Sequence, residues 1–348
     1  NDLPKERVKV DENNSVTDIF HSDYYENIRK KMLAGEKLSA CRRCYKEEEA
    51  GQQSMRNSGY LITSKSTNVR LEYIETESGR HCNLKCRSCD PTISTGWNED
   101  LKKSDWLMEY FDYNNKRKKE LELNYYNDSL EYLTKEECLK LKRLKVTGGE
   151  PFLSRSFLKF VDNLDKWNLA QNIKIEVYTN TSFLPKEKFI KSLLKFDRLE
   201  LHMSIDSVGK RNDYIRSGSD WKTVESVAEY WIKLASKNKQ KIQLMMATTV
   251  SLFNVLTLDE LLDWTSQKIK KYNTVVWNHF TYVHSPKYMC VYNQPKHIKQ
   301  KMLQIINDKF KDKKLTYMQK RQVNKLLKII ELSTPTSISA KKDFRHIT

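Results

Sequence analysis

Length, composition and charge exclude several classes of protein. The chain has 348 residues, enough for one large domain or two medium ones, and 11 % of them are aromatic, too many for a wholly disordered chain. No run of about 18 apolar residues occurs and the first residues lack an apolar core segment, so we expect no membrane span, no signal peptide and a cytoplasmic location. Lys and Arg outnumber Asp and Glu by 62 to 45, which gives a formal net charge of +17.

The first 64 residues are expected to form a small module of their own. Apolar residues at positions 25, 28, 32 and 33 recur at the helical period, and Gly35 is placed to end that helix. Cys41 and Cys44 follow directly, before a second predicted helix at residues 47–56.

Strands and helices alternate through the middle of the chain. We predict helices over 157–167, 189–196, 221–236 and 258–270, and strands over 69–74, 144–147, 173–178, 199–205, 242–250 and 274–280. This rhythm indicates parallel βα units with right-handed crossovers. Six such units fit an α/β fold with a partial (β/α)6 TIM-like barrel, at residues 65–295, better than a closed eightfold barrel.

Two further segments complete the expected organisation. Residues 92–144 form a charged helical insertion in the barrel. The insertion contains the aromatic residues Trp97, Trp106, Tyr110 and Tyr113. It is either a lid that brings these side chains to a substrate or a helical addition that packs them into its own small core. Residues 296–348 form a basic helical tail, with helices over 298–310 and 317–332.

The seven cysteines are unevenly distributed, because five of them lie in two tight clusters. A secreted disulfide framework would spread them more evenly, so the clusters indicate metal ligands in a reducing compartment. Cys138 and Cys290 stand alone, and we predict that both are buried thiols without a chemical role.

Cys82, Cys86 and Cys89 form a C-x3-C-x2-C pattern in one short loop after a predicted strand. Soft thiolates in a tight loop suit an iron–sulfur cluster or zinc. A structural zinc site takes four protein ligands, whereas three thiolates leave one iron of a four-iron cluster open to a substrate or cofactor. The spacing therefore favours an iron–sulfur cluster over zinc.

This loop resembles the signature of the radical S-adenosylmethionine (SAM) superfamily, whose partial (β/α)6 barrel carries three cysteines after its first strand. The superfamily also has a Gly-Gly-Glu-Pro motif after the second strand, and Gly148, Gly149, Glu150 and Pro151 stand at that place here. The resemblance covers residues 65–290. It implies that the three-cysteine loop holds a [4Fe–4S] cluster whose open iron chelates SAM, and that the backbone at 148–150 receives the SAM amino group.

Other positions at strand ends resemble cofactor-binding residues of the superfamily. Ser204 and Asp206 close the fourth predicted strand in a similar Ser-Ile-Asp-Ser segment, and Arg216 resembles an arginine that pairs with the SAM carboxylate. Asn180 and Asn254 follow the third and fifth strands, where they would bind the SAM ribose. The alternatives are a solvated arginine at a helix start and two turn asparagines.

The pair Cys41 and Cys44 would by itself suit zinc or a redox site. In context it resembles the auxiliary-cluster module of twitch and SPASM-type radical SAM proteins, in an N-terminal variety that continues through Tyr45, Glu48, Ser54 and Arg56. The resemblance implies that Cys41 and Cys44 hold a second, auxiliary iron–sulfur cluster. Such modules need one or two more cysteines, so either these ligands lie upstream of residue 1 or the auxiliary site is incomplete, with Cys290 or His21 as candidate substitutes.

The resemblance implies a radical SAM enzyme that takes one electron from a donor such as flavodoxin or ferredoxin. SAM is cleaved to a 5′-deoxyadenosyl radical, which abstracts hydrogen from a substrate. The first substrate candidate is a peptide or protein side chain, because many twitch and SPASM relatives modify peptides. The second is a nucleotide, sugar or nucleic acid, which the charge of +17 would attract unless that charge lies on solvated faces. The competing class is a non-enzymatic zinc protein that binds RNA.

Overall fold

The computed structural model describes residues 10–49, 54, 56–57, 70–107, 109 and 129–332. Six parallel strands lie in sequential order in one sheet, which confirms the expected α/β fold with a partial barrel. They are β1 (Tyr73–Glu77), β2 (Arg143–Thr147), β3 (Lys174–Thr179), β4 (Arg198–Ser204), β5 (Ile242–Val250) and β6 (Val276–Tyr282).

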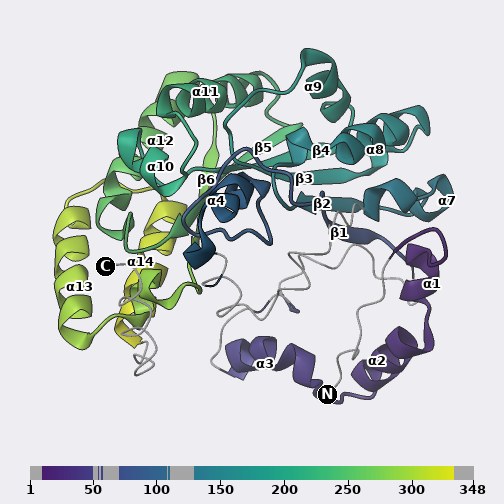
Figure 1. Cartoon of the computed structure of the whole chain (residues 1–348), viewed down its shortest axis with the longest axis horizontal. Helices are drawn as coiled ribbons and strands as arrows, with labels where there is room; N and C mark the ends of the chain where they lie inside the picture. Colours follow the sequence, from purple (N-terminus) through teal and green to yellow (C-terminus); the bar gives the residue numbers. More distant parts are fainter. Residues whose placement is uncertain are drawn as a thin grey trace.

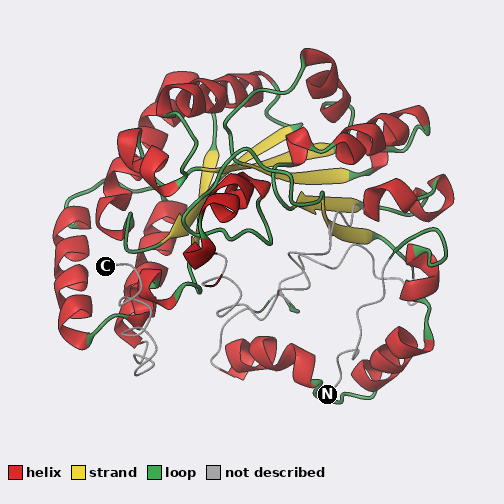
Figure 2. Cartoon of the chain, in the orientation of Figure 1, coloured by secondary structure: helices red, strands yellow, loops and turns green. Residues whose placement is uncertain are grey.

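Helices return the chain between the strands and cover one face of the sheet (Figures 1 and 2). The main crossover helices are α8 (Arg155–Lys166), α9 (Glu187–Leu193), α11 (Trp221–Lys237) and α12 (Leu258–Tyr272). Each was predicted to within three residues at either end. The short helix α10 (Gly209–Ile215), which follows β4, was not predicted.

The strands place apolar and polar side chains on opposite faces of the sheet. On the helix-covered face, alternate residues are fully buried and pack against helix residues such as Phe157 and Trp231. The other face carries charged and polar residues, among them Glu176, Glu200 and His202. Closed barrels fill this interior with branched apolar residues. A polar interior is therefore a feature of this chain that its overall architecture does not require.

The first strand lies later in the sequence than predicted. Expected over residues 69–74, β1 instead runs from Tyr73 to Glu77 and pairs with β2 from Arg143 to Thr147. The period-2 alternation around Leu71 and Tyr73 gives the strand type but does not locate its ends. The shift brings the end of β1 level with the Gly-Gly turn that follows β2.

The C-terminal helices are α13 (Lys296–Phe310) and α14 (Tyr317–Leu332), close to the predicted bounds. Both helices pack against the barrel, because they share a second apolar core with the ends of β5 and β6. Phe280 of β6 donates its backbone N–H to Gln322 Oε1 at 3.1 Å, so a side chain of α14 satisfies a backbone group at the free edge of the sheet.

The N-terminal segment forms α1 (Val16–Phe20), α2 (Asp23–Leu33) and α3 (Arg42–Glu49). Gly35 follows α2 with φ +79°, as expected of a residue that ends a helix. The second predicted helix was misplaced, since α3 begins at Arg42 and ends at Glu49. α1 is tied to the barrel by the backbone N–H of Thr17, which donates to Glu137 Oε1 at 3.1 Å.

The described parts of the 92–144 insertion contain α4 (Asn98–Lys103) and α7 (Lys135–Cys138). Tyr110 and Tyr113 lie outside the described residues. Trp97 is half-buried and Trp106 is exposed, so neither the lid nor the small core is established. Among the described helices, none has the length and apolarity to cross a membrane.

Candidate functional site

The three-cysteine loop follows β1 and lies against the end of α10. The backbone N–H of Lys85 donates to the carbonyl of Ser217, and that of Arg87 donates to the carbonyl of Ile215, both at 2.9 Å. Cys82 is held from the other side, because its backbone N–H donates to Thr95 Oγ1 at 3.1 Å. These bonds fix the loop at the carboxyl end of the sheet, where parallel α/β folds place their chemistry.

The three sulfurs do not form a ready-made site for a single metal ion. Cys86 is buried and Cys82 and Cys89 are half-buried, and the three Sγ atoms do not all lie within 4.8 Å of one another. Two sulfurs bound to one zinc at about 2.3 Å can be at most about 4.6 Å apart. A four-iron cluster takes one thiolate on each of three irons, and the three thiols of this loop supply that donor set.

The thiols also differ in their proton affinity. Burial raises the pKa of Cys82. A hydrogen bond from Cys89 and the positive charge of Arg216 lower the pKa of Cys86, while the same bond to Cys86 raises the pKa of Cys89. Cys86 is thus the thiol whose ionised form the protein stabilises most.

The Gly-Gly turn packs backbone against backbone with the entrance to the cysteine loop. Gly149 N–H donates to the carbonyl of Gly79 and Glu150 N–H to that of His81, both at 2.8 Å. A Cβ on Gly149 would lie 2.3 Å from the His81 carbonyl oxygen, and one on Gly148, where φ is +113°, would lie 2.5 Å from that of Gly79. Only glycine permits this approach at both positions.

Glu150 joins the turn after β2 to the end of β3. Its carboxyl accepts hydrogen bonds from the backbone N–H of Asn180 at 2.6 Å, from Thr179 Oγ1 at 3.0 Å and from the backbone N–H of Phe152 at 3.2 Å. The side chain is almost fully buried. Burial raises the pKa of its carboxyl to about 7, although these three hydrogen bonds act to lower that pKa. The Glu150 side chain is therefore a structural tie rather than an exposed ligand.

Asn180 faces the cysteine loop. Its Nδ2 donates to Asn83 Oδ1 at 2.9 Å and lies 3.7 Å from Cys82 Sγ, while its Oδ1 accepts from the backbone N–H of Ser182 at 2.9 Å. Its side chain thus shapes the turn and also reaches the cysteine loop, while its binding of the SAM ribose stays a prediction.

Arg216 is buried, so its interpretation as a solvated arginine at a helix start is wrong. It follows the last residue of α10, and only 9 % of it is exposed. Its Nε lies 2.9 Å from Asp206 Oδ2, and its Nη1 lies 3.8 Å from Cys86 Sγ. The arginine therefore carries its charge to the cysteine loop, and a buried carboxylate holds it there.

Asp206 is itself fixed by backbone groups. Its Oδ1 accepts from the backbone N–H of Thr249 at 2.7 Å, and its own N–H donates to Asn212 Oδ1 at 3.2 Å. Asn254 Nδ2 donates to the Asp206 carbonyl at 2.8 Å, and Asn254 Oδ1 accepts from the backbone N–H of Ser251 at 2.8 Å. These bonds support the turn-asparagine interpretation of Asn254. Ser204 lies half-buried, two residues before Asp206.

Comparison with known proteins finds distant relatives. No model of a known protein family matches the sequence. The GTP 3′,8-cyclase of Helicobacter pylori strain 26695 is 24 % identical over 143 residues, which are 41 % of this chain and 37 % of the cyclase. The GTP 3′,8-cyclase of strain HPAG1 is 24 % identical over 198 residues, 57 % of this chain and 52 % of the cyclase. The matches thus span about half or less of the length of these relatives.

Solved structures of SAM-bound proteins also align with the chain. Native anSMEcpe with bound AdoMet and a Cp18Cys peptide aligns over 70 % of this chain and 59 % of its own, with 16 % identity and a TM-score of 0.43. Streptococcus suis SuiB bound to S-adenosylmethionine aligns over 89 % of this chain and 65 % of its own, with 14 % identity and a TM-score of 0.36.

The cysteine loop after β1, the Gly-Gly-Glu-Pro turn after β2 and the six parallel strands agree with the match to the cyclases, which are radical SAM enzymes. In its fold and motifs the chain is thus similar to radical SAM enzymes. The cofactors of this superfamily are a [4Fe–4S] cluster and SAM. Membership of the twitch or SPASM subgroup stays a prediction.

A polar layer on the inner face of this partial barrel was not predicted as a site. Glu176, Glu200 and His202 offer ligand atoms that lie within 4.8 Å of one another. Arg143 Nη2 already lies 3.0 Å from Glu176 Oε2 and 2.8 Å from Glu200 Oε2. Because one guanidinium already bridges both carboxylates, this layer is an ion-paired network rather than a cation site.

The N-terminal residues that resemble an auxiliary-cluster module gather around one carboxylate. Glu48 Oε1 accepts from Ser54 Oγ at 2.5 Å and from Arg56 Nε at 3.1 Å, and the Arg56 guanidinium lies 5.1 Å from the centre of the Tyr45 ring. Cys41 and Cys44 are half-buried at the start of α3. Among the described residues, neither belongs to a group of three side chains placed to hold one metal ion.

Several residues that shape the site were missed from the sequence. Asn83, Asn212 and Thr249 hold Asn180 and Asp206 in place. Asn83 occupies an unspecified position of the cysteine motif, and no motif contains the other two. Glu176 and His202 carried a usable signal, because each interrupts a run of apolar residues in a buried strand. A charged residue in such a run is kept only where it has partners.

Proposed function

We propose that this protein is a radical SAM enzyme that cleaves SAM reductively at Cys82, Cys86 and Cys89 and abstracts a hydrogen atom from a peptide or protein side chain. The observation that carries the proposal is the position of the three-cysteine loop beside a buried arginine, at the carboxyl end of a parallel sheet. Three thiolates are one ligand short of a structural zinc site, which argues against the zinc protein that the sequence left as a competitor.

When bound, the cluster and SAM supply the electron transfer that releases methionine and a 5′-deoxyadenosyl radical able to take hydrogen from the substrate. The protein supplies position. The turn at Gly148 and Gly149 sets how closely β2 approaches the cysteine loop, and Glu150 ties that turn to β3. Asn180 holds the side of the loop that carries Cys82. A rigid surround of this kind keeps reacting groups aligned.

Arg216 has two roles in the proposal. Its Nη1 faces Cys86, where a positive charge stabilises a thiolate. The guanidinium is a planar fork suited to a carboxylate, so it would also bind the carboxylate of SAM. Asp206, which occupies Nε, fixes the orientation of that fork. Ser204, at the end of β4, and the backbone at residues 148–150 complete the proposed SAM site.

The proposed substrate is a peptide, on the strength of the resemblance to twitch and SPASM proteins. The same resemblance supports an auxiliary cluster at Cys41 and Cys44 and an electron donor such as flavodoxin or ferredoxin. The match to proteins named GTP 3′,8-cyclase favours a second candidate, the same chemistry on a nucleotide. Strong weakening of substrate binding by salt would favour the polyanionic substrate.

Anaerobic reconstitution tests the proposal. The full chain is loaded with iron and sulfide, reduced with dithionite in the presence of SAM, and assayed for 5′-deoxyadenosine. We expect the wild type to form the product and the triple variant Cys82→Ala, Cys86→Ala, Cys89→Ala to form none. Cys138→Ala is the control, because this buried thiol on α7 lies outside the site. Product from the triple variant would overturn the assignment.

A further inference from the structure

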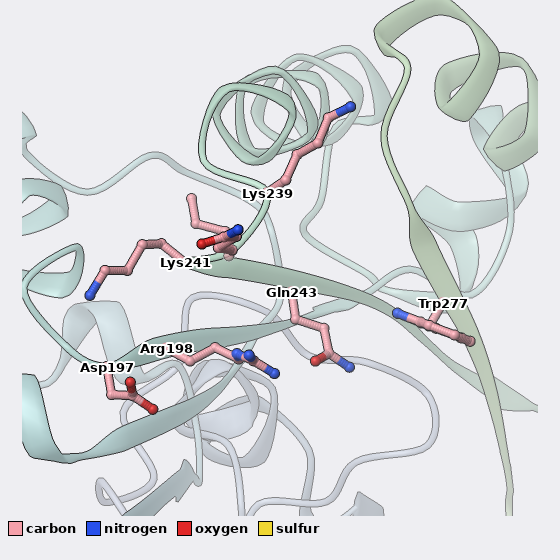
Figure 3. Close-up of a pocket in the computed structure, with 8 residues that line it drawn as sticks. Asp197, Arg198, Lys239, Lys241, Gln243 and Trp277 are labelled. Carbon is pink, nitrogen blue, oxygen red and sulfur yellow. The ribbon is translucent and has the colours of Figure 1, made fainter.

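A cleft of about 580 Å³ opens at the amino ends of β4, β5 and β6, the end of the sheet opposite the cysteine loop. Its walls come from the start of β4, the turn after α11, the start of β5 and one residue of β6. Figure 3 shows the side chains of Arg198, Gln243 and Trp277 reaching the cleft from three neighbouring strands. The site proposed for SAM uses none of these residues.

The polar groups that meet in this cleft are mostly donors. The side chains of Arg198, Gln243 and Trp277 form no hydrogen bond or ion pair with the described residues. The ring of Trp277, which is 36 % exposed, lines the cleft. Lys241 is turned aside, since its Nζ donates to the carbonyl of Phe196 at 3.0 Å. Lys239 stands at the rim and is exposed. Unused donors beside an aromatic face call for a ligand with acceptor groups and an apolar part.

The charge of the cleft is positive, with Arg198, Lys239 and Lys241 against Asp197. Phosphate sites commonly use helix N-termini and glycine-rich loops. Here no helix begins among the lining residues, and glycine is absent from them. Arg198 comes from the start of β4 and Lys239 from the turn after α11, an arrangement that suits carboxylates spaced along a chain better than one compact phosphate.

We propose that this cleft binds an acidic segment of the peptide substrate, with carboxylates at Arg198 and Lys239 and an apolar side chain against Trp277. This inference rests on the proposed peptide-modifying function. Arg198, Glu200, His202 and Ser204 alternate along one face of β4, so the cleft and the cysteine-loop end lie on the same inner face. Six residue steps along β4, about 20 Å, separate Arg198 from Ser204, and the buried side chains of Glu176 and His202 lie between the two ends, so the acidic segment is expected to bind apart from the residue that reacts.

Fluorescence anisotropy on the reconstituted full chain tests the cleft. The probe is a fluorescein-labelled peptide of sequence Glu-Leu-Glu-Ala-Glu-Leu-Glu-Ala, compared with its glutamine counterpart. We expect the wild type to prefer the acidic probe. The double variant Arg198→Gln, Lys239→Gln should weaken its binding at least about tenfold, the effect of losing charge-assisted hydrogen bonds. Trp277→Ala should weaken the acidic and glutamine probes alike.

Lys188→Gln, Lys191→Gln removes the same charge from exposed positions of α9 and is the matched control, expected to change binding less than about twofold. Equal losses in both double variants, or no preference of the wild type for the acidic probe, would overturn the proposal. So would displacement of the probe by inorganic triphosphate at lower concentration than by unlabelled acidic peptide. Formation of 5′-deoxyadenosine without substrate should be unchanged in the cleft variants, and its absence from the wild type would instead refute the proposed function.

Discussion

Arg216 and Asp206 form a buried ion pair in which each side chain has a further neighbour. The arginine faces Cys86, and the carboxylate is held by the backbone of Thr249. Removing one member of such a pair leaves an uncompensated charge in the interior, whereas removing both does not. The sequence resemblance singled out both residues, but no pattern in the sequence indicated that they bind each other.

Replacement of Arg216 by methionine should therefore affect folding as well as cofactor binding. We expect Arg216→Met to lower the free energy of unfolding by about 3–5 kcal/mol, and Arg216→Met, Asp206→Asn to recover most of that loss. The double variant should still bind SAM about ten- to a hundredfold more weakly than the wild type, because the carboxylate of SAM loses its charged partner, Arg216. Urea unfolding and calorimetric SAM titration measure the two effects. A wild-type dissociation constant in the double variant would remove Arg216 from the SAM site.

His202 gives the stability a pH dependence with a definite sign. Burial lowers its pKa to about 4, with His279, Lys145 and Arg143 acting in the same direction and Glu176 opposing them. In the unfolded chain the imidazole has a pKa of about 6.5. Between these values the unfolded chain binds more protons, so stability is complete above pH 6.5 and is lost as the pH falls toward 4, by about 3 kcal/mol.

The test compares urea unfolding of the wild type and of His202→Gln at several pH values from 7 to 4.5. We expect the free energy of unfolding to fall less steeply with decreasing pH in the variant, since it has no imidazole to protonate on unfolding. Parallel curves for the two proteins would mean that His202 takes up its proton in the folded state as readily as in the unfolded chain.

At the scale of elements, the Gly-Gly turn after β2 determines how closely that strand approaches the backbone before the cysteine loop. Gly149 lies against the backbone of His81, one residue before the first cysteine. We expect Gly149→Ala to displace the cysteine loop, to lower stability by about 1–3 kcal/mol and to reduce the iron content after reconstitution, because backbone atoms cannot swing aside. Gly209→Ala is the control, since its added Cβ meets no atom within 4 Å and only its φ of +63° opposes it. Equal iron contents in the two variants would contradict this account.

Most elements could be predicted because their patterns are local. The run Ile242–Val250 alternates buried and half-buried residues along β5, and both ends of that strand were predicted correctly. β1 was misplaced because its ends depend on pairing with β2, some 70 residues away in the sequence. The short helix α10 escaped for a similar reason: it is held by bonds to the cysteine loop rather than by a long apolar face.

At the scale of the whole molecule, the site could be located but not assembled from the sequence. Motifs placed the cysteine loop, the Gly-Gly turn and the strand ends at one edge of the sheet. The bonds from Asn83, Asn212 and Thr249 that fix these groups join residues tens of positions or more apart, or carry no distinctive spacing. The cleft at the other end of the sheet joins residues from three strands, and only the folded chain brings them together.

The cysteines of the N-terminal segment are separate from those of the cysteine loop, so the two sets can be removed independently. Cys41 and Cys44 lie at the start of α3, and the cysteine loop has three thiolates of its own. We therefore expect Cys41→Ala, Cys44→Ala to lose the iron of an auxiliary cluster while the SAM-site cluster is kept. Formation of 5′-deoxyadenosine without substrate should survive, with Cys290→Ala as a control for the loss of an isolated buried thiol.

Turnover of a peptide substrate should fall much further in this variant, because an oxidative step would lack its electron acceptor or the substrate its ligand. The contacts of Glu48 with Ser54 and Arg56 do not involve either sulfur, so the variant should keep the fold of this segment. Iron, sulfide and zinc analysis of both proteins decides the matter. Equal iron in both, with zinc lost from the variant alone, would leave a structural zinc site at Cys41 and Cys44 and an enzyme with a single cluster.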